Sequence, residues 1–141
     1  MDTAFFGGLA GNAGLFSTAR DVARVYQMLL NGGEIDGQRY LSKETCQLFT
    51  TETSKISRRG LGFDKPDADD PKKGNCAPAA PAEVYGHTGF TGTCAWVDPM
   101  NELVYVFLSN RIYPDVTNRK LNQLHIRERI QGAIYDAMKK K

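Results

Sequence analysis

The residues most able to do chemistry lie in one short stretch, GHTGFTG, which begins at Gly86. Gly86 and Gly89 allow close approach to the backbone, so main-chain N–H groups between His87 and Phe90 could bind a substrate carbonyl. Thr88 adds a hydroxyl, and His87 adds a side chain whose charge changes near neutral pH. These are parts of an acyl-transfer site: oxyanion donors, a ligand for a substrate carboxylate and a proton relay. The same residues also fit a glycine-kinked strand with a surface histidine, so the stretch alone leaves both interpretations open.

The residues before this stretch predict two helices joined by a small hairpin. Thr18 and Asp21 have the spacing of a helix-starting capping box, with Asp in place of the usual Glu. The helix that follows has an apolar face and should end at residues 31–33, which are Asn-Gly-Gly. The Asp-Gly pair at 36–37 predicts a two-residue hairpin turn, and Ser42 can cap a second, short helix. The apolar face of the first helix consists of Val22, Val25, Met28 and Leu29.

Three strands and a final helix are expected in the second half of the chain. The apolar runs at 84–88, 93–98 and 103–109 are typical of strands, and the 98–102 link is short enough to make the last two an antiparallel hairpin. Helical spacing of five apolar residues then predicts one long C-terminal helix that could cover a face of the sheet. These residues are Leu121, Leu124, Ile130, Ile134 and Met138.

Helices followed by a meander and a terminal helix are an α+β arrangement, an antiparallel sheet of about three strands packed against helices. We expect residues 1–141 to form a single, partial domain. Within it, residues 64–82 carry four prolines and alternating charges, which predicts a surface loop or insert. The expected strands leave the other edge and the second face of the sheet without a partner from this chain. A three-stranded sheet of this kind invites a partner.

The composition argues against several classes of protein. A net charge of +2, from 18 basic and 16 acidic residues, is too balanced to indicate a nucleic-acid partner. No apolar run approaches the roughly 18 residues of a membrane span, and the first residues lack the pattern of an export signal. Three cysteines without a C-x-x-C pair and two distant histidines indicate no disulfide framework and no metal site. We therefore expect no metal and no cofactor.

Two separated blocks make the chain resemble a known family. The first is AGLFSTARDVARVYQMLLNGG, residues 13–33, and the second is HTG, residues 87–89, followed by FTGTCAWVDPMNELVYVFLSNR. In this order they resemble the serine β-lactamase and penicillin-binding-protein-like family, in its class C-like branch that includes esterases and peptidases. That family carries a K-T-G triad, or H-T-G in many members, on a strand that faces the nucleophile. The resemblance implies the C-terminal part of the β-lactamase/transpeptidase-like fold.

The resemblance also implies roles for single residues. The N–H of Phe90, directly after the triad, would be one oxyanion donor, and the other would belong to the nucleophile. Thr88 and His87 would orient the substrate's carboxylate or carbonyl, and His in place of Lys would make that binding weaker and more dependent on pH. Asn12 and Ala13 lie where the family's glycine-rich loop lines the pocket, although a plain loop before a helix fits them equally well.

The family's nucleophile motif is absent from this sequence. The nucleophile is a Ser followed three residues later by Lys, and no serine here has Lys at that position. A Tyr-x-Asn or Ser-x-Asn base motif is absent too. Because both lie upstream of these blocks in the family, we expect a C-terminal half that holds one wall of a two-walled site and is inactive alone. Its expected partner is the missing N-terminal half of the same fold or a second copy of itself.

Two other interpretations remain open. The chain could be a non-catalytic module that binds a peptide, a cell-wall fragment or another protein through its sheet, or a truncation that self-associates through strand edges. If the intact protein is an enzyme, its substrate would be a β-lactam, a peptidoglycan peptide or a simple ester, and His87 favours a substrate other than β-lactams. The family works mostly outside the cytoplasm, so the resemblance implies a periplasmic or extracellular location.

Overall fold

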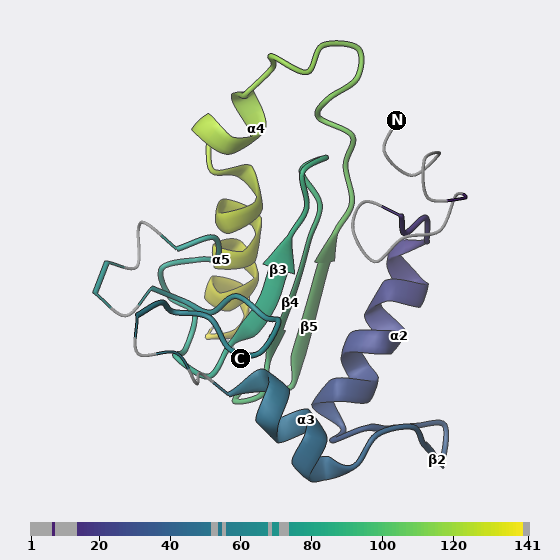
Figure 1. Cartoon of the computed structure of the whole chain (residues 1–141). Coiled ribbons are helices and arrows are strands. Elements are labelled where there is room, and N and C mark those ends of the chain that lie inside the picture. Colours follow the sequence, from purple (N-terminus) through teal and green to yellow (C-terminus); the bar gives the residue numbers. More distant parts are fainter. Residues whose placement is uncertain are drawn as a thin grey trace.

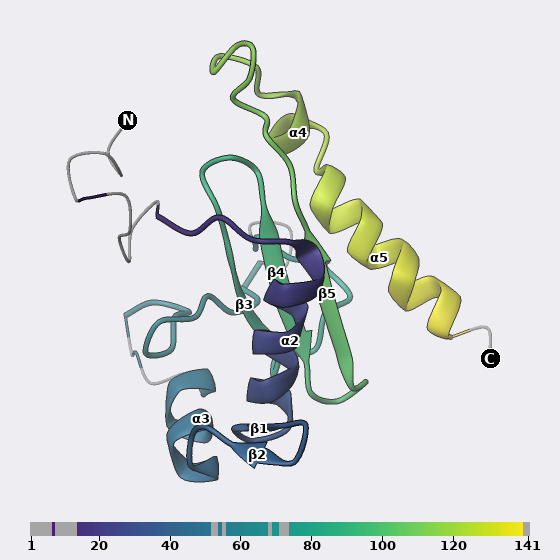
Figure 2. The same ribbon diagram turned by 90° about the vertical axis from the view of Figure 1, so that its right-hand side faces the viewer.

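A computed structural model of the chain describes residues 7, 14–51, 54, 56–67, 69–70 and 74–139. Its centre is a three-stranded antiparallel sheet in the order β3-β4-β5, with one helix on each face (Figures 1 and 2). The α+β class and the meander are therefore confirmed, and the strand ends differ from the predicted ones by at most two residues. The strands are β3, Tyr85–Thr88; β4, Cys94–Asp98; and β5, Leu103–Phe107.

One face of the sheet is covered by α2, Ala19–Leu30, which lies across β4 and β5 (Figure 2). As predicted, the helix is capped by Thr18, whose Oγ1 accepts a hydrogen bond of 3.2 Å from the Asp21 N–H. It ends before Gly32, which adopts a left-handed φ of 67°. The expectation that this chain leaves the second face without cover was therefore wrong. The cover is nevertheless shallow, because no residue of α2 is fully buried and Val25 is 54 % exposed.

A hairpin and a second helix follow α2, as the sequence predicts. Strands β1, Glu34–Ile35, and β2, Gln38–Arg39, are joined by a two-residue turn in which both residues have positive φ, 52° and 74°. Those angles match a type I′ turn, the kind that Asp-Gly favours. Helix α3, Lys43–Thr50, begins at Ser42, whose Oγ accepts a hydrogen bond of 3.1 Å from the Thr45 N–H.

The single C-terminal helix that the sequence predicts is in fact two helices. They are α4, Lys120–Gln123, and α5, Ile126–Met138, and they are separated by His125, whose φ is 49°. A left-handed residue turns the chain sharply, so the apolar positions before and after it no longer share one stripe. Sequence periodicity cannot register such a break, because histidine is not a typical helix breaker.

The buried face of α5 also differs from the predicted one. Its buried residues are Arg127, Gln131 and Tyr135, spaced four apart, whereas Ile130 and Met138 are more than a third exposed. Gln131 Oε1 accepts a hydrogen bond of 2.8 Å from the Ala77 N–H, and the Tyr135 hydroxyl donates to Asp98 Oδ2 at 2.8 Å. Gln131 and Tyr135 are tolerated here because their side chains make hydrogen bonds inside the protein. Of the predicted stripe, Ile134 does pack against the core.

The hydrophobic core lies between the sheet and α5. Trp96 in β4 is 1 % exposed and forms its centre. Cys94 is buried there, and burial raises the pKa of its thiol to about 11. The other members of the buried cluster are Cys76, Val84 and Tyr105.

The stretch 64–82, expected as a surface loop or insert, contributes to the interior at both ends. Its described residues form no helix or strand beyond one bridge at Asp64. Yet Asp64 and Lys65 are buried at one end, and Cys76 and Ala77 are buried at the other. The loop therefore runs from the outer edge of β3 to the surface of α5.

The two outer edges of the sheet differ. No described strand pairs with the outer edge of β5. Because Trp96 lies opposite Tyr105 in the ladder, alternation along the strand turns the N–H and C=O groups of Val104 and Val106 outward. An apolar, unpaired edge of this type is a natural docking site for another strand.

Candidate active site

The outer edge of β3 is occupied at one position and open at the next. Asp64 and Gly86 exchange two backbone hydrogen bonds, of 2.7 and 3.0 Å, in an antiparallel bridge. Because backbone groups of alternate residues face the same side of a strand, the Thr88 N–H points to this same outer edge. No strand or bridge among the described residues covers the edge at Thr88. The strand therefore offers main-chain groups beside His87.

The bridge is held in place by a buried carboxylate. Arg58 Nε donates to Asp64 Oδ1 at 2.8 Å and its Nη2 donates to Oδ2 at 3.1 Å, while Asn75 Nδ2 donates to Oδ2 at 2.9 Å. Burial by itself would raise the pKa of Asp64, but the hydrogen bonds from Arg58 and Asn75 and the charge of Arg58 hold that pKa below its ordinary value. The strand edge before His87 is thus fixed by an ionised, fully hydrogen-bonded group.

Gly86 is required at the bridge by space. A Cβ atom there would lie 2.1 Å from the carbonyl oxygen of Ala95 and 2.8 Å from Cα of Trp96. Both are backbone atoms of β4 and cannot move without breaking the ladder. The first glycine of the GHTG stretch therefore serves the close packing of β3 on β4.

The side chains of His87 and Thr88 emerge on opposite faces of the sheet. His87 lies opposite Ala95 and Thr88 opposite Cys94 in the ladder, and neighbouring residues of a strand alternate between faces. His87 is exposed, and its Nδ1 lies 2.7 Å from the Thr88 carbonyl oxygen. A carbonyl oxygen only accepts, so this contact requires a proton on Nδ1 and leaves Nε2 as the acceptor of the neutral ring.

The turn that joins β3 to β4 brings the fourth predicted residue to the same edge. The Gly89 N–H donates to the Thr93 carbonyl at 2.8 Å, and the Gly92 N–H donates to the Gly89 carbonyl at 2.9 Å. Phe90 lies at the tip, 71 % exposed, and no described residue accepts a hydrogen bond from its N–H. An N–H with no partner, next to an open strand edge, is the type of group that can bind a developing oxyanion.

The structure thus places His87, Thr88, Gly89 and Phe90 along one edge, while Asn12 and Ala13 lie outside the described residues. Sequence reasoning did not find the groups that support this edge. Arg58 and Asp64 belong to segments with no motif, and Arg111, whose guanidinium carbon lies 4.9 Å from the centre of the Phe90 ring, is 21 positions away along the chain. Only tertiary structure brings them to the site.

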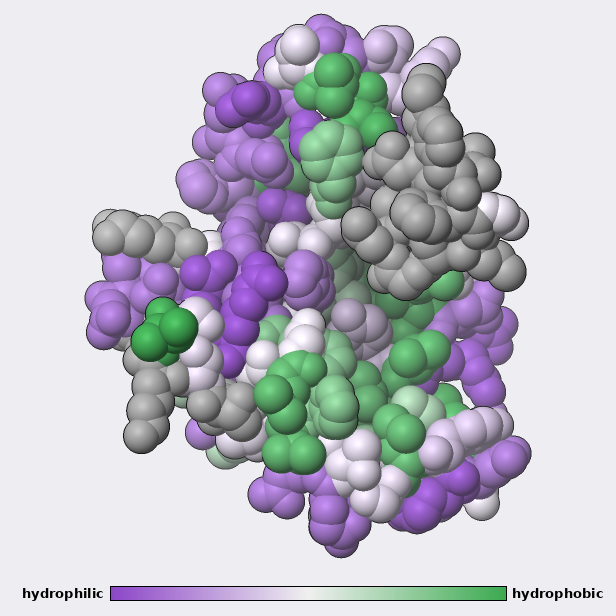
Figure 3. All heavy atoms as spheres, in the orientation of Figure 1, coloured by the Kyte–Doolittle hydropathy of each residue, from purple (hydrophilic) through white to green (hydrophobic). Residues whose placement is uncertain are grey.

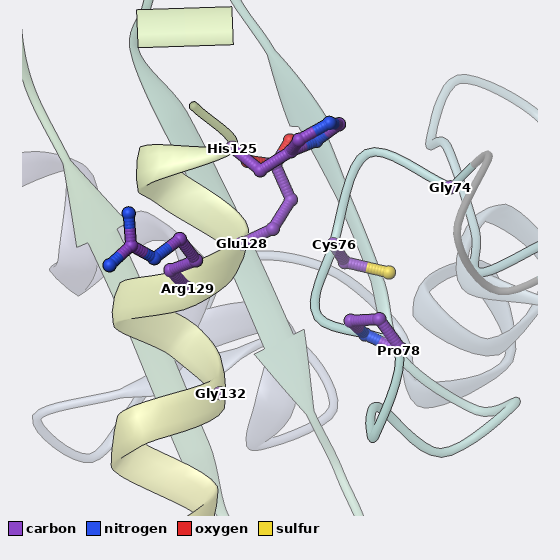
Figure 4. A pocket seen from close by; sticks show the side chains of 7 residues that line it. All are labelled: Gly74, Cys76, Pro78, His125, Glu128, Arg129 and Gly132. Atoms are coloured by element: carbon purple, nitrogen blue, oxygen red, sulfur yellow. The ribbon is translucent and has the colours of Figure 1, made fainter. Parts of the chain in front are cut away.

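A hollow of about 350 Å³ lies elsewhere, between α5 and the 74–78 loop (Figure 4). His125 and Glu128 project from the first turn of α5 beside it, whereas Arg129 points away. No predicted site residue lines this hollow. Glu128 Oε2 has no hydrogen-bond partner among the described residues, and the atom itself is buried.

Apolar side chains gather on the face shown in Figure 3, over α2 and α3 and again beside the β3–β4 turn. The most exposed residue of α3 among them is Leu48, at 53 %, and its neighbour Phe49 is 43 % exposed. Apolar surface of this extent usually marks a contact with another segment or protein.

Among the described residues, no group of three metal-ligating side chains is arranged to hold an ion. No helix in the part of the chain that the structure describes is long and apolar enough to cross a membrane.

Comparison with known proteins decides the family. The sequence model of the family described as "Beta-lactamase" matches residues 2–128. This chain belongs to the β-lactamase family. A crystal structure of a penicillin-binding-protein homologue from Caulobacter crescentus matches 67 % of the chain and 26 % of its own length, with a TM-score of 0.53 and 26 % identity. It confirms the β-lactamase-like, α+β fold.

Curated members of the β-lactamase family support the same assignment. Over 116 residues, or 82 % of this chain, the sequence is 36 % identical to a putative D-alanyl-D-alanine carboxypeptidase of Escherichia coli O157:H7 and 35 % identical to one of Salmonella typhi. The chain spans only about a quarter of the length of these relatives, 26 % and 27 %. Membership of a serine hydrolase family is therefore established, while the activity of a whole protein is a separate question.

Proposed function

We propose that this chain supplies one wall of the active site of a serine hydrolase that cleaves an amide or ester through an acyl-serine. The observation that carries the proposal is the Phe90 N–H, which has no partner among the described residues and lies beside the open edge at Thr88. No serine of the sequence has the nucleophile's spacing to Lys. The nucleophile would then come from the missing N-terminal half of the same fold, the partner that this proposal requires.

The site residues would divide the work as follows. The Phe90 N–H would stabilise the oxyanion, and the Thr88 main chain would align an extended substrate by strand-like hydrogen bonds. Through Nε2, His87 would bind a substrate group or relay a proton to it. Asn12 and Ala13 would line the pocket from the glycine-rich loop.

The substrate class follows from the relatives and from the edge. Relatives named as putative D-alanyl-D-alanine carboxypeptidases support a peptide that ends in D-alanyl-D-alanine, as in peptidoglycan. An extended peptide fits a strand edge, because its backbone can pair with the main chain of β3. β-Lactams and simple esters are the other candidate substrates, and a periplasmic or extracellular location would suit all three.

By itself the chain would be inactive. Oxyanion donors and binding groups without a nucleophile retain only a small part of the rate enhancement of such an enzyme. We expect no stoichiometric adduct in the intact mass of the 141-residue chain after incubation with a reactive β-lactam or an activated ester. A single adduct mapped to one Ser, Thr or Cys would overturn this proposal.

A sharper test separates the Phe90 backbone from its ring. In the whole protein that carries this wall, Phe90→Pro removes the N–H, and we expect kcat to fall by about 10²–10³-fold. Phe90→Ala removes the ring but keeps the N–H and is the matched control, for which we expect kcat within a few-fold of the unmodified protein. Equal losses in both variants would show that the ring, and not the oxyanion donor, matters.

A second candidate function is favoured by the edge of β5. Its outward backbone groups at Val104 and Val106 have no strand partner among the described residues, so two copies could pair there and form a non-catalytic, self-associating module. Sedimentation of the chain over a wide concentration range tests this candidate. A strictly monomeric mass at high concentration would reject it, and a dimer that Val104→Pro abolishes would support it.

A further inference from the structure

The five-residue turn at 89–93 is anchored from outside by two separate parts of the chain. The first anchor is the segment that follows β5. The carbonyl oxygen of Thr91 accepts hydrogen bonds from Ser109 Oγ at 3.1 Å and from the Arg111 N–H at 2.9 Å. Gly92, with a φ of 94°, fits directly against this segment, since a Cβ there would lie 2.6 Å from Ser109 Oγ. The far side of the turn is therefore held by backbone and hydroxyl groups.

The second anchor is a buried guanidinium from α5. Arg127, whose side chain is 8 % exposed, donates from Nη1 to the Thr93 carbonyl at 3.4 Å and from Nη2 to Asn122 Oδ1 at 3.2 Å. Its own carbonyl accepts the Tyr105 hydroxyl at 3.1 Å, which ties this turn of α5 to the sheet. The Thr93 carbonyl thus has two donors, Arg127 and the Gly89 N–H.

We propose that Arg127 is a positioning residue for the site: by holding the Thr93 carbonyl it fixes Gly89, and through Gly89 it fixes the direction of the adjacent Phe90 N–H. The inference rests on the function proposed above for Phe90. Oxyanion donors contribute only when they are held at the position where charge develops, and small displacements lower the rate strongly. A charged donor holds a carbonyl more firmly than a neutral one does.

A packing role alone does not explain this arginine. Burying a charge costs free energy that an apolar side chain of similar size would avoid. The Arg127 Nε has no partner among the described residues, and its nearest carboxylate oxygen, Glu128 Oε1, is 3.8 Å from Nη2. The guanidinium instead has a fork of two donor nitrogens, which bond to the Thr93 carbonyl and to Asn122 Oδ1 at the same time. The compact ammonium of a lysine has a single donor nitrogen and does not reproduce the two separate donor nitrogens of this fork.

Amide hydrogen exchange in the 141-residue chain tests the contact without any catalysis. In Arg127→Met, we expect the Gly89 amide to exchange at least ten-fold faster relative to the Trp96 amide in the middle of the sheet. Arg129→Met removes the same charge from an exposed position of the same helix and should leave that ratio unchanged. Arg127→Lys should restore the ratio only in part.

Two results would overturn the proposal: an unchanged ratio, which includes equal acceleration at Gly89 and Trp96, or full restoration by Lys. If Arg127→Met does not fold, the same ratio is measured in Arg127→Lys, which keeps the buried charge. A ratio above that of the unmodified chain supports the proposal, and an equal ratio contradicts it. In the whole protein, Arg127→Met should lower kcat about ten-fold or more with KM within a few-fold. If the Gly89 amide exchanges faster in Arg127→Met but Phe90→Pro leaves kcat unchanged, the anchor exists and the proposed function of Phe90 is wrong.

Discussion

The two faces of the sheet are covered in different ways. On one face, α5 buries Arg127, Gln131 and Tyr135 and hydrogen-bonds to the loop and strands beneath it. On the other face, α2 lies across β4 and β5 but buries no residue fully. Among the described residues, α5 thus covers its face of the sheet more deeply than α2 covers the other. If the proposed hydrolase has a second part that completes the site, we expect that part to pack on the α2 side, which is also the side on which His87 is exposed.

The largest effect should come from the centre of the α5 face. Trp96→Ala removes a side chain that is 1 % exposed, and we expect a loss of about 3–5 kcal/mol in the free energy of unfolding. Because Trp96 is the only tryptophan, urea unfolding should be followed by far-UV circular dichroism. A loss below about 1 kcal/mol would mean that the core is not built around this residue.

The next effect concerns the hydrogen bond that joins α5 to the loop. Gln131→Met leaves the buried Ala77 N–H without its acceptor, so we expect a loss of about 1–3 kcal/mol. Gln123→Met, at the exposed end of α4, is the matched control and should change stability by less than about 0.5 kcal/mol. Similar values for both variants would remove the distinction between the two faces.

A smaller effect should appear as a dependence on pH. The pKa of Asp64 is lower in the folded chain than in the unfolded one. The carboxylate therefore contributes stability that is present above the unfolded pKa near 4 and is lost as the pH falls through the folded value. Between pH 6 and pH 3, Asp64→Asn should lose less stability than the unmodified chain. Asp136→Asn, at an exposed position of α5, should follow the unmodified chain.

The smallest effect is expected on the α2 face. Val25→Ser alters a side chain that is 54 % exposed, and we expect less than about 0.5 kcal/mol in this chain. In a whole protein whose other part covers α2, the same substitution should cost more, up to about 2 kcal/mol. Identical small values in both settings would show that nothing covers this face.

Local signals predicted the fold well. The Thr18 and Ser42 caps, the Asp36-Gly37 turn and the three strands are each specified by neighbouring residues, and each is present. The errors arose where distant parts of the chain meet. The polar buried face of α5 depends on a hydrogen bond between residues 54 positions apart, and the left-handed conformation of His125 has no signal in the periodicity.

The site was predictable only in part, for the same reason. The residues of the β3 edge are consecutive, so His87, Thr88, Gly89 and Phe90 could be named from one motif. Their supporting groups, Arg58 and Asp64 on one side and Arg127 on the other, come from segments without a motif. The sequence thus indicates which groups could react, while the groups that hold them in position are found only from the tertiary structure.

The close packing at Gly86 has a practical consequence for protein engineering. Position 86 accepts no side chain, because a Cβ would collide with the backbone of β4. Position 87 projects into open space on the opposite face. A combinatorial library that tests the proposed substrate contact of residue 87 should therefore keep residue 86 as glycine and place its diversity at residue 87, where nearly every variant should still fold.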